Sequence, residues 1–189
     1  MLFLGGFAGC AHTVESLYGS MTTEKVELSG GQFNYYYNFE RRAGNEALLV
    51  FLDGSGYVSV LGKFDGTQVR RWGLTGVLNQ EFGREFDLLV PEKPMVQPGA
   101  DASKDPAVVG SYSLESRSRG SVAVIDRVLS SRTYKEVFLL GVSEGGQLLP
   151  HVFTRLANRE GISKQVMASA GGMSQYQEFQ VLWRDDEAK

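Results

Sequence analysis

The sequence predicts an α/β fold, with a mostly parallel sheet and helices on both of its faces. Residues 47–52 form a continuous apolar run, as expected of a strand that is buried on both faces. Residues 86–90 and the run that begins at Val137 are further short apolar runs, and segments with helical spacing separate and follow them. Strands that alternate with helices form parallel sheets, because each helix returns the chain to the same end of the sheet.

Three further segments are predicted as strands from their β-branched and aromatic residues or apolar character. Residues 26–28 and 33–39 are rich in strand formers, and a Ser-Gly-Gly turn separates them, which predicts a hairpin. Residues 165–170 are the last predicted strand. This strand is expected at an edge of the sheet, where its backbone and its apolar side chains would be exposed.

Helices are predicted in three places. Residues 68–82 have amphipathic spacing, although two glycines weaken it. Residues 114–129 repeat apolar or small side chains every three or four positions, and Ser113 precedes them as an N-cap. A third helix is predicted after residue 143, whereas residues 97–110 are polar and predict a loop. The expected inward stripe of the second helix consists of Leu114, Ser118, Val122, Ile125 and Leu129.

The composition is that of an ordinary globular domain, and it excludes several classes of function. A chain of 189 residues suits one domain, and its hydrophobic (42%) and charged (22%) fractions are typical of soluble proteins. With a net charge of −3 and no cluster of Lys and Arg, nucleic acid is not an expected partner. One cysteine and two histidines lack the spacing of a metal site, and no phosphate-binding loop or complete dinucleotide fingerprint is present. The sequence therefore predicts neither a metal nor a cofactor.

Residues 1–25 are interpreted as an apolar leader followed by a polar linker. No stretch reaches the ~20 apolar residues that are needed to cross a membrane. Phe7-Ala8-Gly9-Cys10 resembles a bacterial lipobox, in which small residues precede a cysteine that becomes lipidated. Two interpretations stay open: an exported, lipid-anchored protein of the bacterial periplasm or membrane surface, or a cytoplasmic protein with a disordered leader and an inert Cys10.

The most informative motif is Gly141-Val142-Ser143-Glu144-Gly145, a G-x-S-x-G sequence. An apolar run leads into it, and a segment with helical spacing follows it. A strand, a sharp turn with a serine at its apex and a helix form the arrangement of a nucleophile elbow. The turn needs Gly141 and Gly145 because its backbone is strained and because the strand and the helix pass close together.

A second glycine-rich turn, Asp53-Gly54-Ser55-Gly56, follows the first apolar run. Ligands of parallel α/β sheets bind beyond the carboxyl ends of the strands. This turn and Ser143 both stand at such ends. The sequence therefore predicts that the two motifs face each other across one crevice.

On these motifs, the chain resembles the α/β-hydrolases over about residues 26–175. The resemblance implies that Ser143 is the nucleophile that attacks an ester, thioester or amide carbonyl. It further implies that the backbone N–H of Glu144 is one oxyanion donor and that the N–H of Ser55, or alternatively of Gly56, is the second.

The chain also departs from the family pattern. The family has His-Gly where this chain has Asp53-Gly54, which keeps the backbone donor because the donor follows the glycine. The family requires an acid and then a histidine after the serine. The later histidine here, His151, stands two helical turns on, about 12 Å along the axis, and is expected to be structural or exposed; His12 lies in the leader. Residues 26–189 are therefore interpreted as a partial, truncated hydrolase domain that lacks its C-terminal strands, its acid and its histidine.

The predicted function is that of a serine hydrolase acting on a small-molecule or peptide substrate with a scissile carbonyl. Two alternatives stay open: a catalytically inactive binding or scaffold protein with the α/β-hydrolase fold, and a doubly wound domain in which the G-x-S-x-G has arisen by chance. A truncated domain is expected to have low solubility and stability on its own. No sequence feature specifies the oligomeric state.

Overall fold

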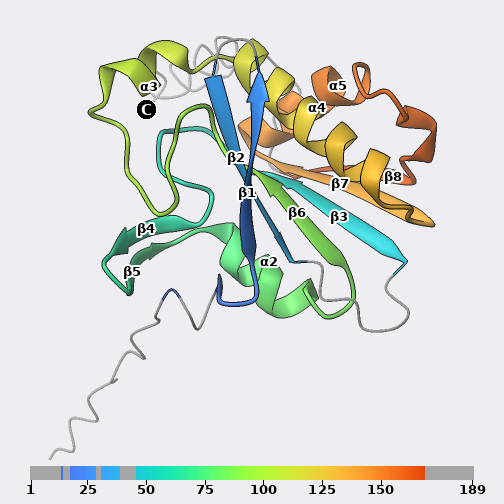
Figure 1. Cartoon of the computed structure of the whole chain (residues 1–189), viewed down its shortest axis with the longest axis horizontal. Coiled ribbons are helices and arrows are strands. Elements are labelled where there is room, and N and C mark those ends of the chain that lie inside the picture. Colours follow the sequence, from blue (N-terminus) through green and yellow to red (C-terminus); the bar gives the residue numbers. More distant parts are fainter. Residues whose placement is uncertain (1–13, 15–17, 29–30, 39–45, 169–189) are drawn as a thin grey trace, which may run out of the picture.

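The computed structural model describes residues 14, 18–28, 31–38 and 46–168 of the chain. The strands are β1 (Thr22–Leu28), β2 (Gly31–Asn38), β3 (Ala47–Leu52), β4 (Gly62–Asp65), β5 (Gln68–Trp72), β6 (Asp87–Pro91), β7 (Glu136–Val142) and β8 (Lys164–Ala168). The helices are α2 (Leu74–Phe82), α3 (Pro106–Ser111), α4 (Leu114–Ser131), α5 (Glu144–Phe153) and the short 3-10 helix η1 (Arg159–Gly161). Figure 1 shows their arrangement.

Six of these strands form one sheet in the order β1-β2-β6-β3-β7-β8, and β4 and β5 form a separate hairpin. The strands β3, β6, β7 and β8 run parallel to one another. The hairpin of β1 and β2 is joined to β6 in antiparallel orientation. The predicted fold class, a mostly parallel sheet with helices on both faces, is confirmed.

The two faces of the sheet are covered by different helices, as the alternation of side chains along β3 shows. Leu48, Val50 and Leu52 pack in one cluster with side chains of α4 and α5, which lie side by side in Figure 1. Phe51 points to the opposite face and packs in a second cluster with Leu78 of α2. Burial of each such side chain contributes about 1.5–3 kcal/mol, so β3 is held firmly at the centre of the sheet.

The predicted helix over residues 68–82 is wrong at its start. Its first residues form β5, and a two-residue turn in which Gly66 has a φ of 57° joins this strand to β4. Gly73 then separates β5 from α2, because a methyl group there would lie 2.2 Å from the carbonyl oxygen of Val60. A close approach between two backbones, which residue spacing does not report, therefore requires glycine at the N-cap of this helix.

The segment 97–110, predicted as a loop, contains the start of α3. The carboxylate of Asp105 accepts the N–H of Ala107 at 2.9 Å and the N–H of Val108 at 3.5 Å. Pro106 occupies the first turn, where its missing N–H has no cost. An aspartate followed by a proline is a helix-start signal, so this helix could have been predicted from the sequence.

The predicted linker is also corrected, because the domain begins before residue 26. The strand β1 starts at Thr22. Tyr18 is only 5% exposed, and its hydroxyl donates to the carbonyl oxygen of Leu61 at 2.5 Å. Cys10 and His12 lie outside the described residues, so the lipobox interpretation stays a prediction.

The helix α4 begins as predicted, and most of its predicted inward stripe is confirmed: Ser118 and Ile125 are buried, and Val122 and Leu129 pack against the core. The hydroxyl of Ser113 accepts the N–H of Ser116 at 3.0 Å, and the hydroxyl of Ser116 accepts the N–H of Ser113 at 3.0 Å, which makes a capping box. Leu114, expected inside, is 39% exposed, whereas Arg117 is 5% exposed. The buried residues of this helix are Arg117, Ser118, Gly120, Ser121, Val124, Ile125 and Val128. Arg117, which the predicted stripe does not include, is also buried because it has buried partners, which are described below.

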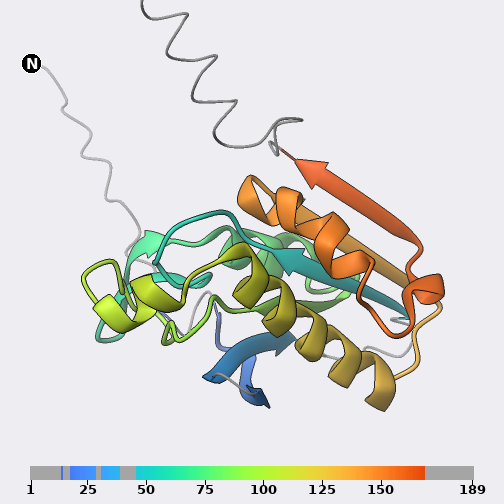
Figure 2. The same cartoon turned by 90° about the horizontal axis from the view of Figure 1, so that it is seen from above.

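The outermost described strand on one side of the sheet is β8 (Figure 2). Its apolar side chains Val166 and Met167 are 49% and 59% exposed. The predicted exposure of apolar side chains on the last strand is confirmed for the described residues. The expected strand end at residues 169–170 lies outside them.

The corrected N-terminal boundary predicts a core role for Tyr18. Tyr18→Ala should lower the free energy of unfolding by about 3–5 kcal/mol, because it removes a buried ring and leaves the carbonyl of Leu61 without its donor. Lys25→Ala, at an exposed position of β1, should change this free energy by no more than about 0.5 kcal/mol. Urea denaturation measures both values. An equally mild effect of the two substitutions would contradict the assignment of Tyr18 to the core.

Candidate active site

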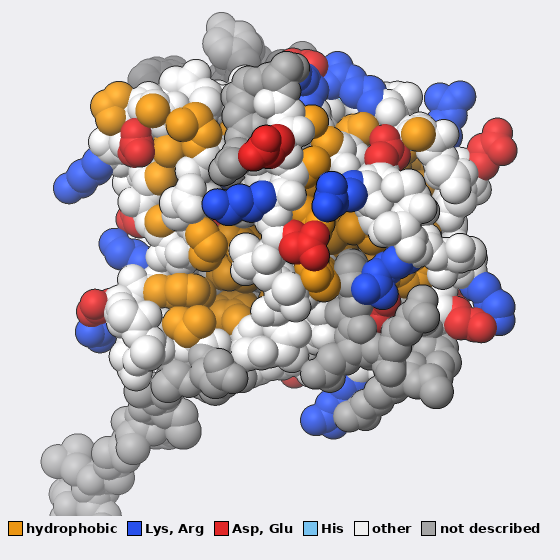
Figure 3. Space-filling model, in the orientation of Figure 1, with side chains coloured by type: hydrophobic (Ala, Val, Ile, Leu, Met, Phe, Trp, Pro, Cys, Tyr) orange, Lys and Arg blue, Asp and Glu red, His pale blue; other side chains and the backbone are white. Residues whose placement is uncertain are grey.

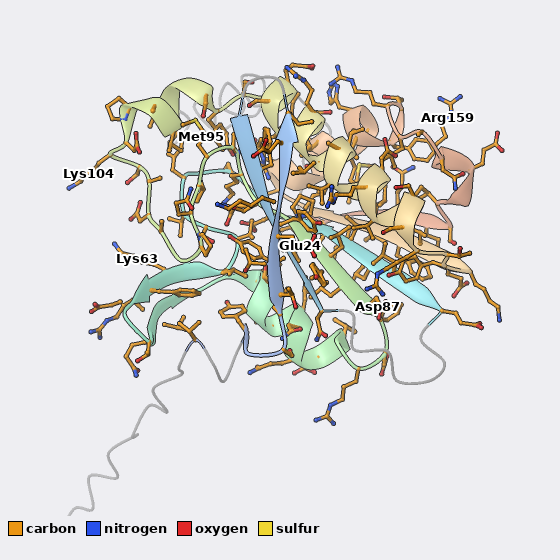
Figure 4. All side chains as sticks on the ribbon, in the orientation of Figure 1. Glu24, Lys63, Asp87, Met95, Lys104 and Arg159 are labelled. Carbon is orange, nitrogen blue, oxygen red and sulfur yellow. The ribbon has the colours of Figure 1, made fainter. Side chains whose placement is uncertain are left out.

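The carboxyl ends of β3, β6 and β7 meet at one edge of the sheet, because these strands are parallel. In Figure 4, Asp87 marks the edge of the sheet where β6 starts, and Met95 marks the opposite edge, beyond the end of β6. The loops 53–61 and 92–105 and the turn into α5 all begin at the edge on the side of Met95. Ligands of parallel α/β sheets bind at this edge.

Ser143 forms the turn between β7 and α5. The strand ends at Val142 and the helix begins at Glu144, so one residue makes the whole turn. The φ and ψ angles of Ser143 are 55° and −124°, a left-handed conformation that is strained for a residue with a side chain, and this side chain is exposed. Its N–H donates to the carbonyl oxygen of Ala168 at 2.9 Å, and its carbonyl accepts the N–H of Gly146 at 2.9 Å.

Two glycines allow the backbones around this turn to touch. A methyl group at Gly145 would lie 2.0 Å from the carbonyl oxygen of Leu52, at the end of β3. A methyl group at Gly141 would lie 2.4 Å from the carbonyl oxygen of Gly145. Neither position has room for a side chain. This is the close packing of strand and helix for which the sequence motif requires glycine.

The loop after β3 lies directly beside Ser143. A methyl group on Gly54 would lie 3.3 Å from the Cβ of Ser143 and 3.7 Å from its hydroxyl oxygen. The two loops are adjacent because β3 pairs with β7, with Leu52 opposite Gly141. The structure thus brings together the two motifs that the sequence predicts on either side of one crevice.

The two residues that carry the predicted backbone donors belong to the segments that meet at Ser143. Glu144 is the first residue of α5, and the first N–H groups of a helix have no acceptor within it. The helix dipole also favours negative charge at this end. Ser55 is exposed and follows Gly54, on which an added methyl group would lie in contact with Ser143. The catalytic roles of these groups stay predictions.

Asp53, the first residue of the loop after β3, pairs with Lys93 from the loop after β6. The Nζ of Lys93 lies 3.0 Å from the Oδ2 of Asp53 and donates to the carbonyl oxygen of Val58 at 2.7 Å. The side chains are 3% and 24% exposed, respectively. Removing either partner would leave a shielded charge unpaired, which is costly, so the pair ties the two loops together.

Glu92, next to Lys93, is buried among hydrogen-bond donors. Its carboxylate accepts the hydroxyls of Ser59 at 2.6 Å and Tyr36 at 3.0 Å and the N–H of Val60 at 3.1 Å. Burial raises the pKa of this carboxyl above its ordinary value, although the hydrogen bonds and the charge of Lys93 act in the opposite direction. The sequence analysis missed this group, because nothing local marks a Glu-Lys pair after a strand as buried.

A cavity of about 400 Å³ opens beside these loops. Its volume lies in the range that is typical of small-molecule sites. Ser143 does not line it, so the cavity borders the loop after β3 rather than the serine itself. The lining residues are Asp53, Ser55, Gly56, Val58, Ser59, Gly62, Gly73, Leu74 and Lys93.

A buried ion pair between α4 and α5 flanks the same turn. The Nη1 of Arg117 lies 2.9 Å from the Oε1 of Glu144, and the side chains are 5% and 10% exposed. Tyr112, the C-cap of α3, donates its hydroxyl to Glu144 at 3.1 Å, and its ring centroid lies 5.7 Å from the guanidinium carbon. Burial raises the pKa of Tyr112 to about 12, so its hydroxyl is a donor at neutral pH. The sequence analysis missed Arg117, because a cation within a helical stripe is ordinarily solvated.

Several other features of the described residues bear on the site. His151 is exposed on the last turn of α5, as expected. Within the described part of the chain, the hydroxyl of Ser143 makes no hydrogen bond to a histidine or a carboxylate, and no group of three or more His, Cys, Asp and Glu side chains could hold a metal ion.

Every described helix is too short or too polar to cross a lipid bilayer. On the face drawn in Figure 3, Lys and Arg side chains are interspersed with Asp and Glu.

By sequence, no family model and no curated protein matches the chain. By structure, it resembles a thermostable carboxyl esterase from Bacillus coagulans, in complex with glycerol, with a TM-score of 0.58 and 10% identity over 87% of this chain and 50% of that one. An epoxide hydrolase from Vigna radiata gives a TM-score of 0.51 and 14% identity over 89% and 46% of the two chains. An N-acyl homoserine lactonase variant, complexed with N-hexanoyl homoserine lactone, gives 0.51 and 15% over 84% and 49%.

These likenesses show that the chain has the α/β-hydrolase fold, as its motifs predict. The proteins named above are hydrolases, but at such low identity the likeness extends to the fold alone. The chain spans about half the length of the solved structures that it resembles, with 50%, 46% and 49% of those three chains covered.

The backbone contacts of the elbow predict opposite effects for two glycine substitutions. Gly145→Ala should lower the free energy of unfolding by about 3 kcal/mol or more, because the new methyl group would overlap the carbonyl oxygen of Leu52. Gly110→Ala, in α3, should be neutral or stabilising by up to about 1 kcal/mol, because no atom lies within 4 Å of the new methyl group. Thermal and urea unfolding measure both effects. A tolerated Gly145→Ala would contradict the close packing of α5 on β3.

The buried carboxyl of Glu92 predicts a pH dependence of stability. Its folded-state pKa is raised above the ordinary 4.5, so its contribution to stability is complete below pH 4.5 and is lost as pH rises through the folded value. Glu92→Gln, which resembles the neutral acid, should lack this loss. Wild type should therefore lose stability relative to the variant by up to about 1.4 kcal/mol per pH unit. Urea denaturation from about pH 4.5 to neutral pH tests this, and parallel curves for the two proteins would contradict it.

Proposed function

We propose that the chain carries the nucleophile of a serine hydrolase that acts on esters, thioesters or amides. The observation that most supports this proposal is the conformation of Ser143, an exposed serine with a φ of 55° between a parallel strand and a helix. Strained residues other than glycine cluster at functional sites, where the surrounding structure holds a conformation that costs stability. The hydroxyl is thereby presented to a substrate carbonyl at the edge of the sheet.

In the proposed reaction, the Oγ of Ser143 attacks the carbonyl carbon while its proton passes to a base. The tetrahedral intermediate collapses when the bond from this carbon to the leaving group breaks, and the leaving group takes the proton and departs as an alcohol, thiol or amine. Water then attacks the acyl-serine, which releases a carboxylic acid and restores the hydroxyl. One water molecule is consumed for each bond that is cleaved.

The backbone around Ser143 is suited to stabilise the negative charge that develops on the carbonyl oxygen of the substrate. The proposed donors to this oxygen are the N–H of Glu144 at the start of α5 and the N–H of Ser55. Such a donor is worth about 10²–10³ in kcat, because it is oriented before the charge appears. The helix dipole adds a positive potential at the same place.

The proposed chemistry also requires a base. Neither a histidine nor a carboxylate in the described residues contacts the hydroxyl of Ser143. In α/β-hydrolases the acid and the histidine follow the serine along the chain. We therefore assign the base to residues of the same protein that lie outside the described ranges.

We propose a small-molecule substrate. The esterase and the lactonase that share the fold are described with glycerol and with N-hexanoyl homoserine lactone bound. The cavity beside Ser55 has a volume of about 400 Å³, which is within the range of small-molecule sites. Because Asp53, Ser59 and Lys93 line it, a polar group of the substrate suits it better than a long alkyl chain.

A second candidate is a binding or scaffold protein that keeps the fold without catalysis. One observation favours it, namely the absence of a base beside Ser143 among the described residues. A serine without a base is a weak nucleophile, although oriented backbone donors alone still accelerate a reaction relative to water.

Labelling by a fluorophosphonate probe separates the two candidates, because the probe reacts with activated serines. The wild-type chain should be labelled, and Ser143→Ala should abolish the labelling. Ser130→Ala, which removes an exposed serine of α4, is the matched control and should label like wild type.

Two results would contradict the proposal. Labelling that persists in Ser143→Ala would place the reactive group elsewhere. An unlabelled wild-type protein that circular dichroism shows to be folded would favour the scaffold candidate.

A further inference from the structure

Arg117 is a buried cation that joins three segments of the chain around the Ser143 turn. From α4, its Nη1 lies 2.9 Å from the Oε1 of Glu144 and 3.3 Å from the carbonyl oxygen of Gly54. Its Nη2 donates to the carbonyl oxygen of Asp53 at 2.8 Å. A guanidinium holds several acceptors at once because its N–H groups form a rigid planar fork, which a lysine ammonium lacks.

These contacts determine which way the peptides of the loop face. In a trans peptide, the carbonyl of one residue and the N–H of the next point in opposite directions, and the described residues contain no cis peptide. The carbonyl of Gly54 points to Arg117, so the N–H of Ser55 points away from it. If this peptide rotated, a carbonyl oxygen would replace the donor, and an oxygen would repel a developing oxyanion.

We infer that Arg117 is a positioning residue for the oxyanion site. Through the carbonyls of Asp53 and Gly54, it orients the backbone N–H of Ser55 beside Ser143. The inference rests on the proposed function, because this donor has a task only if Ser143 forms an oxyanion intermediate. Arg117 acts through the backbone and does not itself contact the substrate.

Arg117 has a second effect on the same site, which is electrostatic. Glu144 carries a buried carboxylate one residue after Ser143, and a negative charge there opposes a developing oxyanion. Arg117 and the hydroxyl of Tyr112 both bind this carboxylate. The orientation of the loop and the neutralisation of Glu144 are separate effects, so different substitutions distinguish them.

Three variants make this distinction. Arg117→Lys keeps the charge but loses the fork. Glu144→Gln keeps the fork on the loop carbonyls but removes the carboxylate. The double variant Arg117→Met with Glu144→Gln removes both charges together, so that no buried charge is left unpaired to unfold the protein. Arg70→Lys, in an exposed ion pair with Asp65 on the β4–β5 hairpin, is the matched control.

Backbone ¹⁵N order parameters of residues 54–56 measure how rigidly the loop is held, independently of any activity. They should be near about 0.85 in wild type and should fall below about 0.6 in Arg117→Lys and in the double variant, while those of β3 stay unchanged. Glu144→Gln and Arg70→Lys should keep the loop rigid. A loop that stays rigid in both Arg117 variants would overturn the inference.

The second-order rate constant of fluorophosphonate labelling at Ser143 measures the consequence. A misplacement of about 1 Å can lower a rate by about 10²-fold, so both Arg117 variants, measured as folded protein, should label about 10²-fold more slowly than wild type. A mobile loop with an unchanged rate would overturn the role of Arg117 in orienting a donor. If wild type itself is not labelled, the proposed function fails, and the order parameters still decide whether Arg117 holds the loop.

Discussion

The backbone of α5 lies directly on the ends of β3 and β7, with no side chain between them. The space at Gly145 and Gly141 is smaller than a methyl group, because carbonyl oxygens of the neighbouring backbone occupy it. This contact holds Ser143 in a conformation that costs about 1–3 kcal/mol in isolation. This contact also positions the start of α5, the loop after β3 and the carboxylate of Glu144.

Two shielded ion pairs hold the loop after β3 in this position. Lys93 binds the side chain of Asp53, and Arg117 binds the carbonyls of Asp53 and Gly54 while it pairs with Glu144. Burying charges costs desolvation energy, so such pairs contribute little net stability. Their effect is instead on the conformation of the loop. Because breaking either ion pair is costly, the loop is restricted to one arrangement.

The described residues supply one part of the proposed hydrolytic site and not another. The strained serine and the backbone donors depend on strand order and helix position, which the fold provides. The base depends on side chains that no described segment brings to Ser143. Because a shared fold does not assign an activity by itself, the chemistry of Ser143 and its neighbours carries the functional proposal.

The sequence alone determined the parallel core and the place of the candidate nucleophile. Apolar runs and the G-x-S-x-G are local patterns, and the position of Gly54 beside Ser143 follows from the rule that parallel strands end at one edge. The helix start at Asp105 also depends on neighbouring residues, although the sequence pattern was interpreted as a loop. These features were predictable because each depends on neighbouring residues or on strand direction.

Only the tertiary structure decided the hairpin of β4 and β5, the boundary at Tyr18 and the burial of Arg117. The contacts that set the boundary at Tyr18 and the burial of Arg117 join residues far apart in the sequence. Tyr18 and Leu61 are 43 residues apart, Lys93 and Asp53 are 40 apart, and Arg117 and Glu144 are 27 apart. A charged residue in a helical stripe is solvated unless a partner meets it, and that partner is specified by packing rather than by spacing. The sequence therefore placed the serine, whereas the tertiary structure decided what surrounds it.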